Sequence, residues 1–254
     1  MVEVKAWWGR GRGALSVACV TVVGMTTDGR KRAGAKRPAV RVPEVRLPGL
    51  RPYDGAELEP EGDYDGLAFT DADFAGQSGI GARFLDCGLY ACVLDETELV
   101  AARFTDCVLE GIRGVGTDLS KAGLRDVEVR DARLGGTQLH GAVLERVVVR
   151  GGKIDYLNLR GAVLKDVTFE GVVLSEADFG GARLERVAFR GCVLRRADFT
   201  GARMTDVDLR AAAEIDVARG IEHLAGALIS PSQLLDLAPA FAAQLGVRVE
   251  AAED

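Results

Sequence analysis

The stretch ADFGGARLERVAFRGCVLRRADFTGARM, residues 177–204, places a large apolar residue at every fifth position. These residues are Phe179, Leu184, Phe189, Leu194, Phe199 and Met204. A period of five fits neither the 3.6-residue period of an α-helix nor the two-residue period of a flat strand. The stretch therefore predicts a structural unit that turns once every five residues.

The same spacing extends in both directions from this stretch. From Phe69 to Leu209, every fifth residue is Phe, Leu, Ile, Val or Met, and no insertion breaks the frame. The two exceptions are Gly79 and Gly114. A smaller residue usually stands two positions before each large one, and Gly recurs two positions after it. One large filler, one small neighbour and one compact residue at the bend suit the short side of a coil, so the pattern predicts stacked coils.

The repeat is cleanest in ADFAG (72–76), ADFGG (177–181) and ADFTG (197–201). A small residue, then Asp, then a large apolar residue and two freer positions resembles the motif of the pentapeptide-repeat family. The resemblance implies an all-β fold, a right-handed quadrilateral β-solenoid with four pentapeptides in each coil and about seven coils in this chain. The expected core includes Phe84, Phe104, Leu144, Leu164, Leu184, Phe179 and Phe199.

Three segments follow from this pattern: a leader over residues 1–60, a solenoid over 61–216 and a C-terminal cap over 217–254. The leader is first basic and then punctuated by prolines, which predicts a flexible segment. Its apolar run at residues 14–25 is interpreted either as the apolar part of a signal peptide or as an extension upstream of a true start at Met25. The second interpretation is favoured, because no clean cleavage site follows the run.

The cap contains a helix start signal. Ser230 stands before Pro231 and three residues before Gln233, which is a capping box with proline at the first helical position. A helix is predicted over about residues 231–245. It either covers the last coil or joins two chains as a homodimer, and the sequence does not separate these alternatives.

The sequence is poor in groups that perform chemistry. It has two histidines and no phosphate-binding loop motif, so we expect no catalytic residue, no cofactor, no metal and no enzymatic activity. Four of the five cysteines occupy the small inward position of the repeat, which favours buried, reduced thiols and a cytoplasmic protein. They are Cys87, Cys92, Cys107 and Cys192. No run of 18 apolar residues occurs, so no membrane association is expected.

Charge is distributed unevenly along the predicted rod. Residues 61–118 hold twelve acidic residues against three basic ones, whereas residues 119–216 are balanced. This distribution argues against direct nucleic-acid binding. Reading at 20-residue intervals gives a first column that contains Glu98, Asp118, Asp178 and Asp198. A second column begins with Asp86, Asp106 and Asp126 and continues with Arg146, Asp166, Arg186 and Asp206. We expect local neutralisation of the second column by Arg83, Arg103, Arg183 and Arg203.

Two functional interpretations remain open. Ladders of carboxylates on a rod would imitate the DNA backbone, and resemblance to the quinolone-resistance pentapeptide proteins implies DNA gyrase or a related topoisomerase as the protein partner. The expected contact residues are then Glu98, Asp118, Asp178 and Asp198 of the first column and Asp86, Asp106 and Asp126 of the second. In the alternative, aspartates before the large residue serve only turn hydrogen bonds, and the rod is a rigid scaffold for an unrelated protein.

Overall fold

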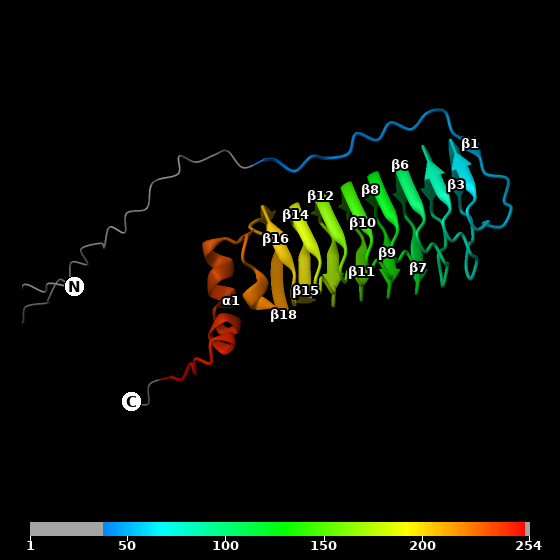
Figure 1. Ribbon diagram of the computed structural model, residues 1–254. Coiled ribbons are helices and arrows are strands. Elements are labelled where there is room, and N and C mark those ends of the chain that lie inside the picture. Colours follow the sequence, from blue (N-terminus) through cyan, green and yellow to red (C-terminus); the bar gives the residue numbers. More distant parts are fainter. Residues whose placement is uncertain (1–37, 252–254) are drawn as a thin grey trace, which may run out of the picture. The chain divides into compact units, whose positions relative to one another are not determined.

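The computed structural model describes residues 38–251. They form a parallel β-solenoid of about nine turns with one C-terminal helix, which confirms the expected fold class (Figure 1). Each coil has four sides, which we number in chain order. In the coil of residues 82–101, face 1 holds Arg83–Leu85, face 2 holds Gly88–Tyr90, face 3 centres on Leu94 and face 4 centres on Leu99.

A 13-stranded sheet forms faces 1 and 2. Its strands are β1 (Arg51–Pro52), β2 (Asp63–Asp65), β3 (Leu67–Thr70), β4 (Arg83–Leu85), β5 (Gly88–Tyr90), β6 (Arg103–Glu110), β8 (Gly123–Arg130), β10 (Val143–Arg150), β12 (Val163–Glu170), β14 (Arg183–Arg190), β16 (Arg203–Thr205), β17 (Val207–Asp208) and β19 (Ala227–Leu228). Paired residues on neighbouring strands are one coil apart in the sequence, so that Leu144 pairs with Leu164 and Leu164 with Leu184. Equivalent residues of successive repeats therefore stack directly on one another.

A six-stranded sheet forms face 3. Its strands are β7 (Arg113–Val115), β9 (Arg133–Gly135), β11 (Lys153–Asp155), β13 (Val173–Ser175), β15 (Val193–Asp198) and β18 (Glu214–Arg219). Face 4 is joined by single parallel bridges from Ser78 to Asp198. Two helical elements follow the last long strand, a 3₁₀ turn η1 (Ile221–His223) and helix α1 (Pro231–Gln244).

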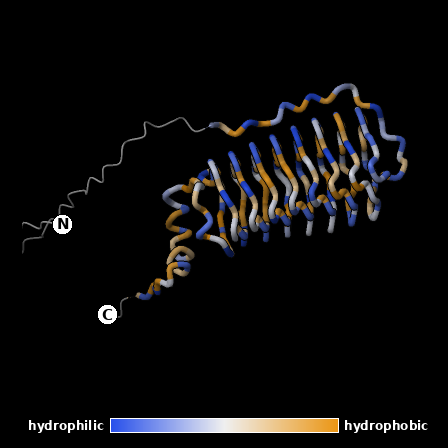
Figure 2. Tube along the Cα trace, viewed as in Figure 1, coloured by the Kyte–Doolittle hydropathy of each residue, from blue (hydrophilic) through white to orange (hydrophobic). Residues whose placement is uncertain are grey.

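The core is a stack of layers in which equivalent positions hold similar residues. All seven expected core residues are buried, with side chains no more than 3% exposed. Phenylalanines one coil apart stack face to face, with ring centroids 4.6 Å apart for Phe84 and Phe104 and 5.0 Å apart for Phe179 and Phe199. Hydrophobic and hydrophilic residues alternate along the coils (Figure 2). Each large side chain thus packs against its equivalents above and below.

The parallel ladder continues past both limits of the predicted solenoid. β1 pairs with β3 at the beginning, and β19 pairs with β17 at the end. The solenoid therefore has about nine turns rather than about seven and exceeds residues 61–216. These outer strands lie outside the run of the five-residue motif. Backbone pairing holds them together with side-chain packing, since Tyr53 beside β1 and Ala227 of β19 both pack against the core.

Helix α1 closes the C-terminal end of the ladder. Ser230 Oγ accepts a hydrogen bond from Gln233 N, and Gln233 Oε1 accepts one from Ser230 N, at 3.2 and 2.9 Å. Gln233 Nε2 also donates to the carbonyl of Leu209 in the last coil, at 2.8 Å. An edge carbonyl is thereby satisfied by a side chain rather than left open to another strand. Pro239 lies inside the helix without ending it.

Only the second part of the predicted leader lies within the described residues. Residues 1–37, including the apolar run and Met25, lie outside the described residues. Residues 38–50 are extended and run alongside β14, β12, β10, β8 and β6 before the chain enters the ladder at β1 (Figure 1). We call residues 38–50 the strap. One hydrogen bond and the buried side chain of Pro43 attach it to the solenoid, and the flexibility of the leader stays a prediction.

Candidate partner-binding surface

The first acidic column lies in one line on face 4. Successive parallel bridges join Ser78 to Glu98, Glu98 to Asp118, and so on to Asp198, with Gln138 and Asn158 in between. Coils are about 4.8 Å apart, so these side chains stand at regular intervals along the solenoid. The structure therefore brings together all four predicted contact residues of this column.

Three of the four carboxylates also serve local turns. Asp118, Asp178 and Asp198 each accept a hydrogen bond through Oδ1 from the backbone N–H two residues later, at 2.7–2.8 Å. Such bonds fix the turn that follows the strand. Glu98 makes none and is exposed. A turn-forming role and a contact role are therefore compatible at the three aspartates, since one oxygen of each remains outside the turn bond.

The remaining oxygens differ in their surroundings. Asp178 Oδ2 forms an ion pair with Arg160 Nη1 at 2.9 Å, and Asp198 Oδ2 lies 3.5 Å from Arg219 Nε. Burial alone would raise the pKa of Asp198, but the hydrogen bonds from Thr200 and the charge of Arg219 outweigh it and lower that pKa. Within residues 38–251, Glu98 and Asp118 form no ion pair. The uncompensated charge of this column is thus concentrated in the first coils.

The second column lies at the corner between faces 1 and 2. Asp86, Asp106 and Asp126 have φ values of 51°, 54° and 53°. Asp tolerates this left-handed region better than most residues, which is a structural reason for its recurrence at the corner. Side chains one coil apart then stand close enough to interact.

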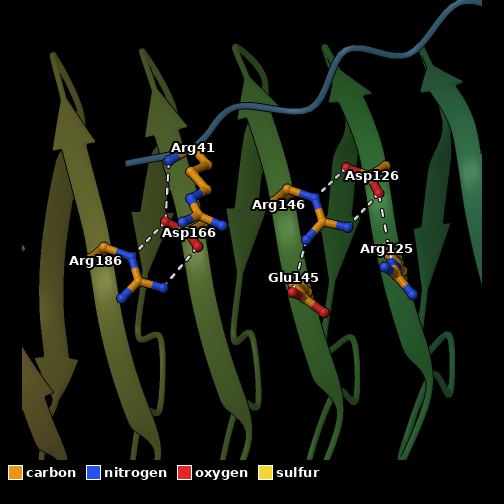
Figure 3. A network of polar contacts seen from close by, with 7 residues as sticks. All are labelled: Arg41, Arg125, Asp126, Glu145, Arg146, Asp166 and Arg186. Atoms are coloured by element: carbon orange, nitrogen blue, oxygen red, sulfur yellow. Dashed lines mark hydrogen bonds and ion pairs between the residues drawn. The ribbon is translucent and has the colours of Figure 1, made fainter. Parts of the chain in front are cut away.

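Arginines of the same column neutralise its second half. Arg146 binds both carboxylate oxygens of Asp126 at 2.6 Å each, and Arg186 binds both oxygens of Asp166 at 2.7 and 2.8 Å (Figure 3). These are bidentate, charge-assisted pairs. The predicted contact residue Asp126 is therefore neutralised within its own column.

The arginines expected to neutralise this column are not those that do so. Arg83 pairs with Asp63, with Nε 2.7 Å from Oδ1. Within residues 38–251, no ion pair joins Arg103, Arg183 or Arg203 to the three predicted aspartates. The reason is geometric: these arginines point outward from face 1, whereas Arg146 and Arg186 stack directly in the corner column. The 20-residue spacing was the signal that could have identified the two pairs.

Asp86 and Asp106 form the uncompensated part of the second column. Neither has an ion pair within the described part of the chain. Burial, and then the charges of Asp126 and Asp86, raise the pKa of Asp106. The folded protein therefore holds the Asp106 proton more tightly than the unfolded chain does.

Removing this charge is expected to stabilise the fold. For a carboxylate with a raised pKa, the folded state is penalised above the unfolded pKa of about 4, and the penalty disappears as pH falls. Asp106→Asn should therefore raise the Tm by about 1–3 °C at pH 7 and leave it nearly unchanged at pH 3.5. Asp118→Asn, which removes a charge but keeps a turn acceptor, is the control. Circular dichroism melts measure both; equal effects of Asp106→Asn at the two pH values would contradict the explanation.

Ion pairs are distributed unequally between the two halves of the solenoid. Within residues 38–251, Asp63 and Glu110 are the acidic residues of segment 61–118 that form ion pairs. Most acidic residues of segment 119–216 are paired, chiefly with arginines. The exposed, uncompensated negative charge therefore belongs to the first coils. We call segment 61–118 the acidic segment.

The cysteine thiols of the repeat lie inside the solenoid. The four repeat cysteines are free and buried. Burial raises the pKa of each, that of Cys107 to about 12, so the thiolate form is suppressed. Residues 38–251 contain no cluster of three or more His, Cys, Asp or Glu side chains that could hold a metal ion. In the same range, no helix has the length and apolar character needed to cross a membrane.

Comparison with known proteins gives matches to family models and to solved structures. A model described as pentapeptide repeat region matches residues 82–159, and one described as pentapeptide repeats matches 142–181, 155–191 and 173–210. No curated protein matches.

Two solved structures represent the structural matches. HetL, a pentapeptide repeat protein involved in heterocyst differentiation regulation from the cyanobacterium Nostoc sp. strain PCC 7120, is 19% identical, with 69% of this chain and 92% of HetL covered and a TM-score of 0.38. Full-length QnrB1, a plasmid-mediated fluoroquinolone resistance protein, is 15% identical, with 79% and 97% covered and a TM-score of 0.30. From its repeat, its coils and the matching family models, the chain belongs to the pentapeptide-repeat family.

Proposed function

We propose that this chain is a non-enzymatic, cytoplasmic protein that binds a basic surface of a protein partner through its acidic segment. The specific partner proposed is DNA gyrase or a related topoisomerase, with the solenoid acting as a DNA mimic and conferring quinolone-type resistance. The observation that carries the proposal is the unequal pairing of charge. Among the described residues, Asp63 and Glu110 are the acidic residues of segment 61–118 that form ion pairs, whereas most acidic residues of segment 119–216 do so.

The geometry of the acidic segment supports a DNA-like partner surface. Glu98 and Asp118 repeat at the coil spacing on face 4, and Asp86 and Asp106 repeat at the corner of faces 1 and 2. Duplex DNA carries one negative charge per about 1.7 Å of helix axis, so a solenoid must use several columns together to approach that density. Regularly spaced, unpaired carboxylates attract a basic surface that normally binds phosphate, and they are electrostatically complementary to it.

A rigid scaffold for an unrelated protein is the second candidate. The turn hydrogen bonds of Asp118, Asp178 and Asp198 favour it, because they give those residues a structural role that needs no partner. A scaffold needs only a stable rod, and its function would not depend on the charge of the acidic columns.

A supercoiling assay with purified gyrase, with and without a quinolone, separates the two. The test variant is Asp86→Asn, Glu98→Gln, Asp106→Asn and Asp118→Asn combined. Each change removes an unpaired charge of the acidic segment, and Asn at 118 keeps an oxygen for the turn bond. If the acidic segment mimics DNA, the concentration needed for half-maximal inhibition or protection rises about tenfold or more.

The matched control neutralises four carboxylates that the structure pairs with arginine. It combines Glu145→Gln, Glu170→Gln, Glu185→Gln and Glu214→Gln, and it should retain the activity of the unmodified protein. Equal loss in both variants would show that net charge matters rather than the acidic segment. No effect of the unmodified protein on gyrase would move the proposal to the scaffold.

The C-terminal cap supports a homodimer as part of the same proposal. Helix α1 leaves Leu234 and Leu235 exposed at 51% and 75%, and Leu245 just beyond it is 79% exposed. Exposed apolar side chains gathered on one terminal element favour contact with a second copy.

A further inference from the structure

Outward side chains on face 2 are buried, unlike those on the other faces. At the position just before the central residue of a repeat, Val143 and Val163 on face 1 are 50% and 37% exposed. At equivalent outward positions on face 2, Val108 is 6% exposed, Val148 1% and Ala188 4%. A side chain that points away from the solenoid core is shielded from solvent where another segment covers it.

The covering segment is the strap. Its first residues, Pro38 to Val40, line a hollow of about 250 Å³ together with Ala188 and Leu228. Arg41 N then donates a hydrogen bond to Asp166 Oδ1 at 3.1 Å, where the strap crosses the corner column (Figure 3). From there the strap runs along the remaining strands toward β1 (Figure 1).

The strap shows the burial pattern of an extended segment lying on a surface. Pro43 is buried and Val45 and Leu47 are half-buried, while the intervening Glu44 and Arg46 are exposed. Alternation with a period of two means that one side of an extended backbone faces the solenoid and the other faces solvent.

Face 2 is chemically suited to such a segment. Its outward position, at 20-residue intervals, is small or uncharged in most coils: Gly88, Val108, Val148, Thr168 and Ala188. The exception within this run is Glu128, which is 12% exposed and held by Arg130 at 2.6 Å and Arg150 at 3.3 Å. Its charge is therefore compensated within the solenoid.

The strap is held weakly compared with the ladder. Within residues 38–251, no backbone–backbone hydrogen bond joins it to the solenoid, and Arg41 N to Asp166 Oδ1 is its hydrogen bond to the rod. Pro38, Pro43 and Pro48 have no N–H to donate, which prevents the strap from becoming a strand. Beneath the strap, Thr168 Oγ1 is buried without a hydrogen-bond partner. This unsatisfied hydroxyl lowers the stability of the state in which the strap covers face 2.

We propose that face 2 is an interaction surface for an extended, largely apolar, proline-containing segment, and that the strap is its displaceable occupant within the same chain. Side-chain packing without backbone pairing allows the strap to detach while the coils stay folded. A strap tied to its own face has an effective concentration of about 1 mM, so a competing segment must exceed that or bind more tightly. This surface differs from the first acidic column, which lies on face 4, and it meets the second column at Asp166.

Thiol labelling of the full chain tests whether the strap opens locally. In a Cys19→Ser background, Val148→Cys places a thiol under the strap, Val143→Cys places one on open face 1, and Val147→Cys places one in the core. The four buried cysteines should react slowly because their pKa values are raised. We expect Val148→Cys to react about a hundredfold more slowly than Val143→Cys and at least about tenfold faster than Val147→Cys.

Either limiting result overturns the proposal. A rate equal to that of Val147→Cys means that the strap leaves only when the solenoid unfolds. A rate equal to that of Val143→Cys means that the strap does not cover face 2.

A peptide of residues 38–50 tests the surface itself. In the full chain with Val45→Ser and Leu47→Ser, the resident strap is weakened, and the labelled peptide should bind at least about tenfold more tightly than to the unmodified chain. Adding Val148→Lys should abolish binding, whereas Val143→Lys, on face 1, should not. Failure of the peptide to bind the weakened-strap protein, or equal loss with both lysine variants, would refute face 2 as an interaction surface.

Discussion

Leu184→Asp is expected to destroy the order of several coils. Leu184 is 1% exposed and stacks between Leu164 and Met204 in the ladder of face 1. A carboxylate at this position has no cation within so narrow a core, and burying it unpaired is among the most destabilising substitutions known. We expect a loss of about 4 kcal/mol or more in the free energy of unfolding, measured by urea denaturation and followed by circular dichroism.

The damage should be local in origin because coils contact only their neighbours. The matched control is Val163→Asp, an outward residue of face 1 in the preceding coil that is 37% exposed and pairs with Arg183 in the ladder. It should change the stability by no more than about 0.5 kcal/mol. If both variants melted like the unmodified protein, Leu184 would not point inward and the five-residue register would be wrong.

The sequence predicts the core well because the five-residue period admits one inward register. Phe179, Leu184 and their equivalents must fill a narrow interior, and no insertion shifts the frame. The number of turns is less predictable, because β1 and β19 lie outside the motif. Their pairing depends on backbone hydrogen bonds, to which residue identity contributes little.

The surface is only partly predictable from the same repeat. Stacking at 20-residue intervals correctly groups the acidic columns, but it does not show that Asp126 and Asp166 are neutralised within their own column. The strap is harder still, since its prolines and basic residues are typical of disordered segments. Its only signal is indirect: an outward column on face 2 that is small or uncharged where other faces carry arginine. Such a column indicates a covered face only once the covering segment is known.

Asp166→Asn is the second substitution with a large expected effect. The Asp166 side chain is 1% exposed, and its two oxygens bind Arg186, which is itself 15% exposed (Figure 3). Removing the carboxylate leaves a poorly hydrated guanidinium without a counter-charge. Asn tolerates the left-handed backbone at this position, so the change acts through charge. We expect a loss of about 2 kcal/mol at pH 7.

The effect should depend on pH in a defined direction. The Arg186 hydrogen bonds, which outweigh burial, lower the pKa of Asp166 in the folded state. A group with a lowered folded pKa stabilises the fold above its unfolded pKa of about 4, and this contribution is lost as pH falls through the folded value. Urea denaturation at pH 7 and at pH 3 should therefore show a gap between the unmodified protein and Asp166→Asn that narrows in acid.

Asp126→Asn is the matched control for burial. Asp126 makes the same bidentate contact with Arg146, but its side chain is 21% exposed and that of Arg146 is 20% exposed. Water can hydrate the orphaned guanidinium there, so this variant should lose about half as much stability. Asp166 also accepts the hydrogen bond from Arg41 N, and this bond is stronger while the acceptor is charged. Asn keeps an oxygen but loses the charge, so Asp166→Asn should in addition speed labelling of Val148→Cys under the strap, whereas Asp126→Asn should not. Equal losses at pH 7 together with unchanged labelling would mean that the corner column is an ordinary surface ladder of ion pairs and that the strap is held by packing alone.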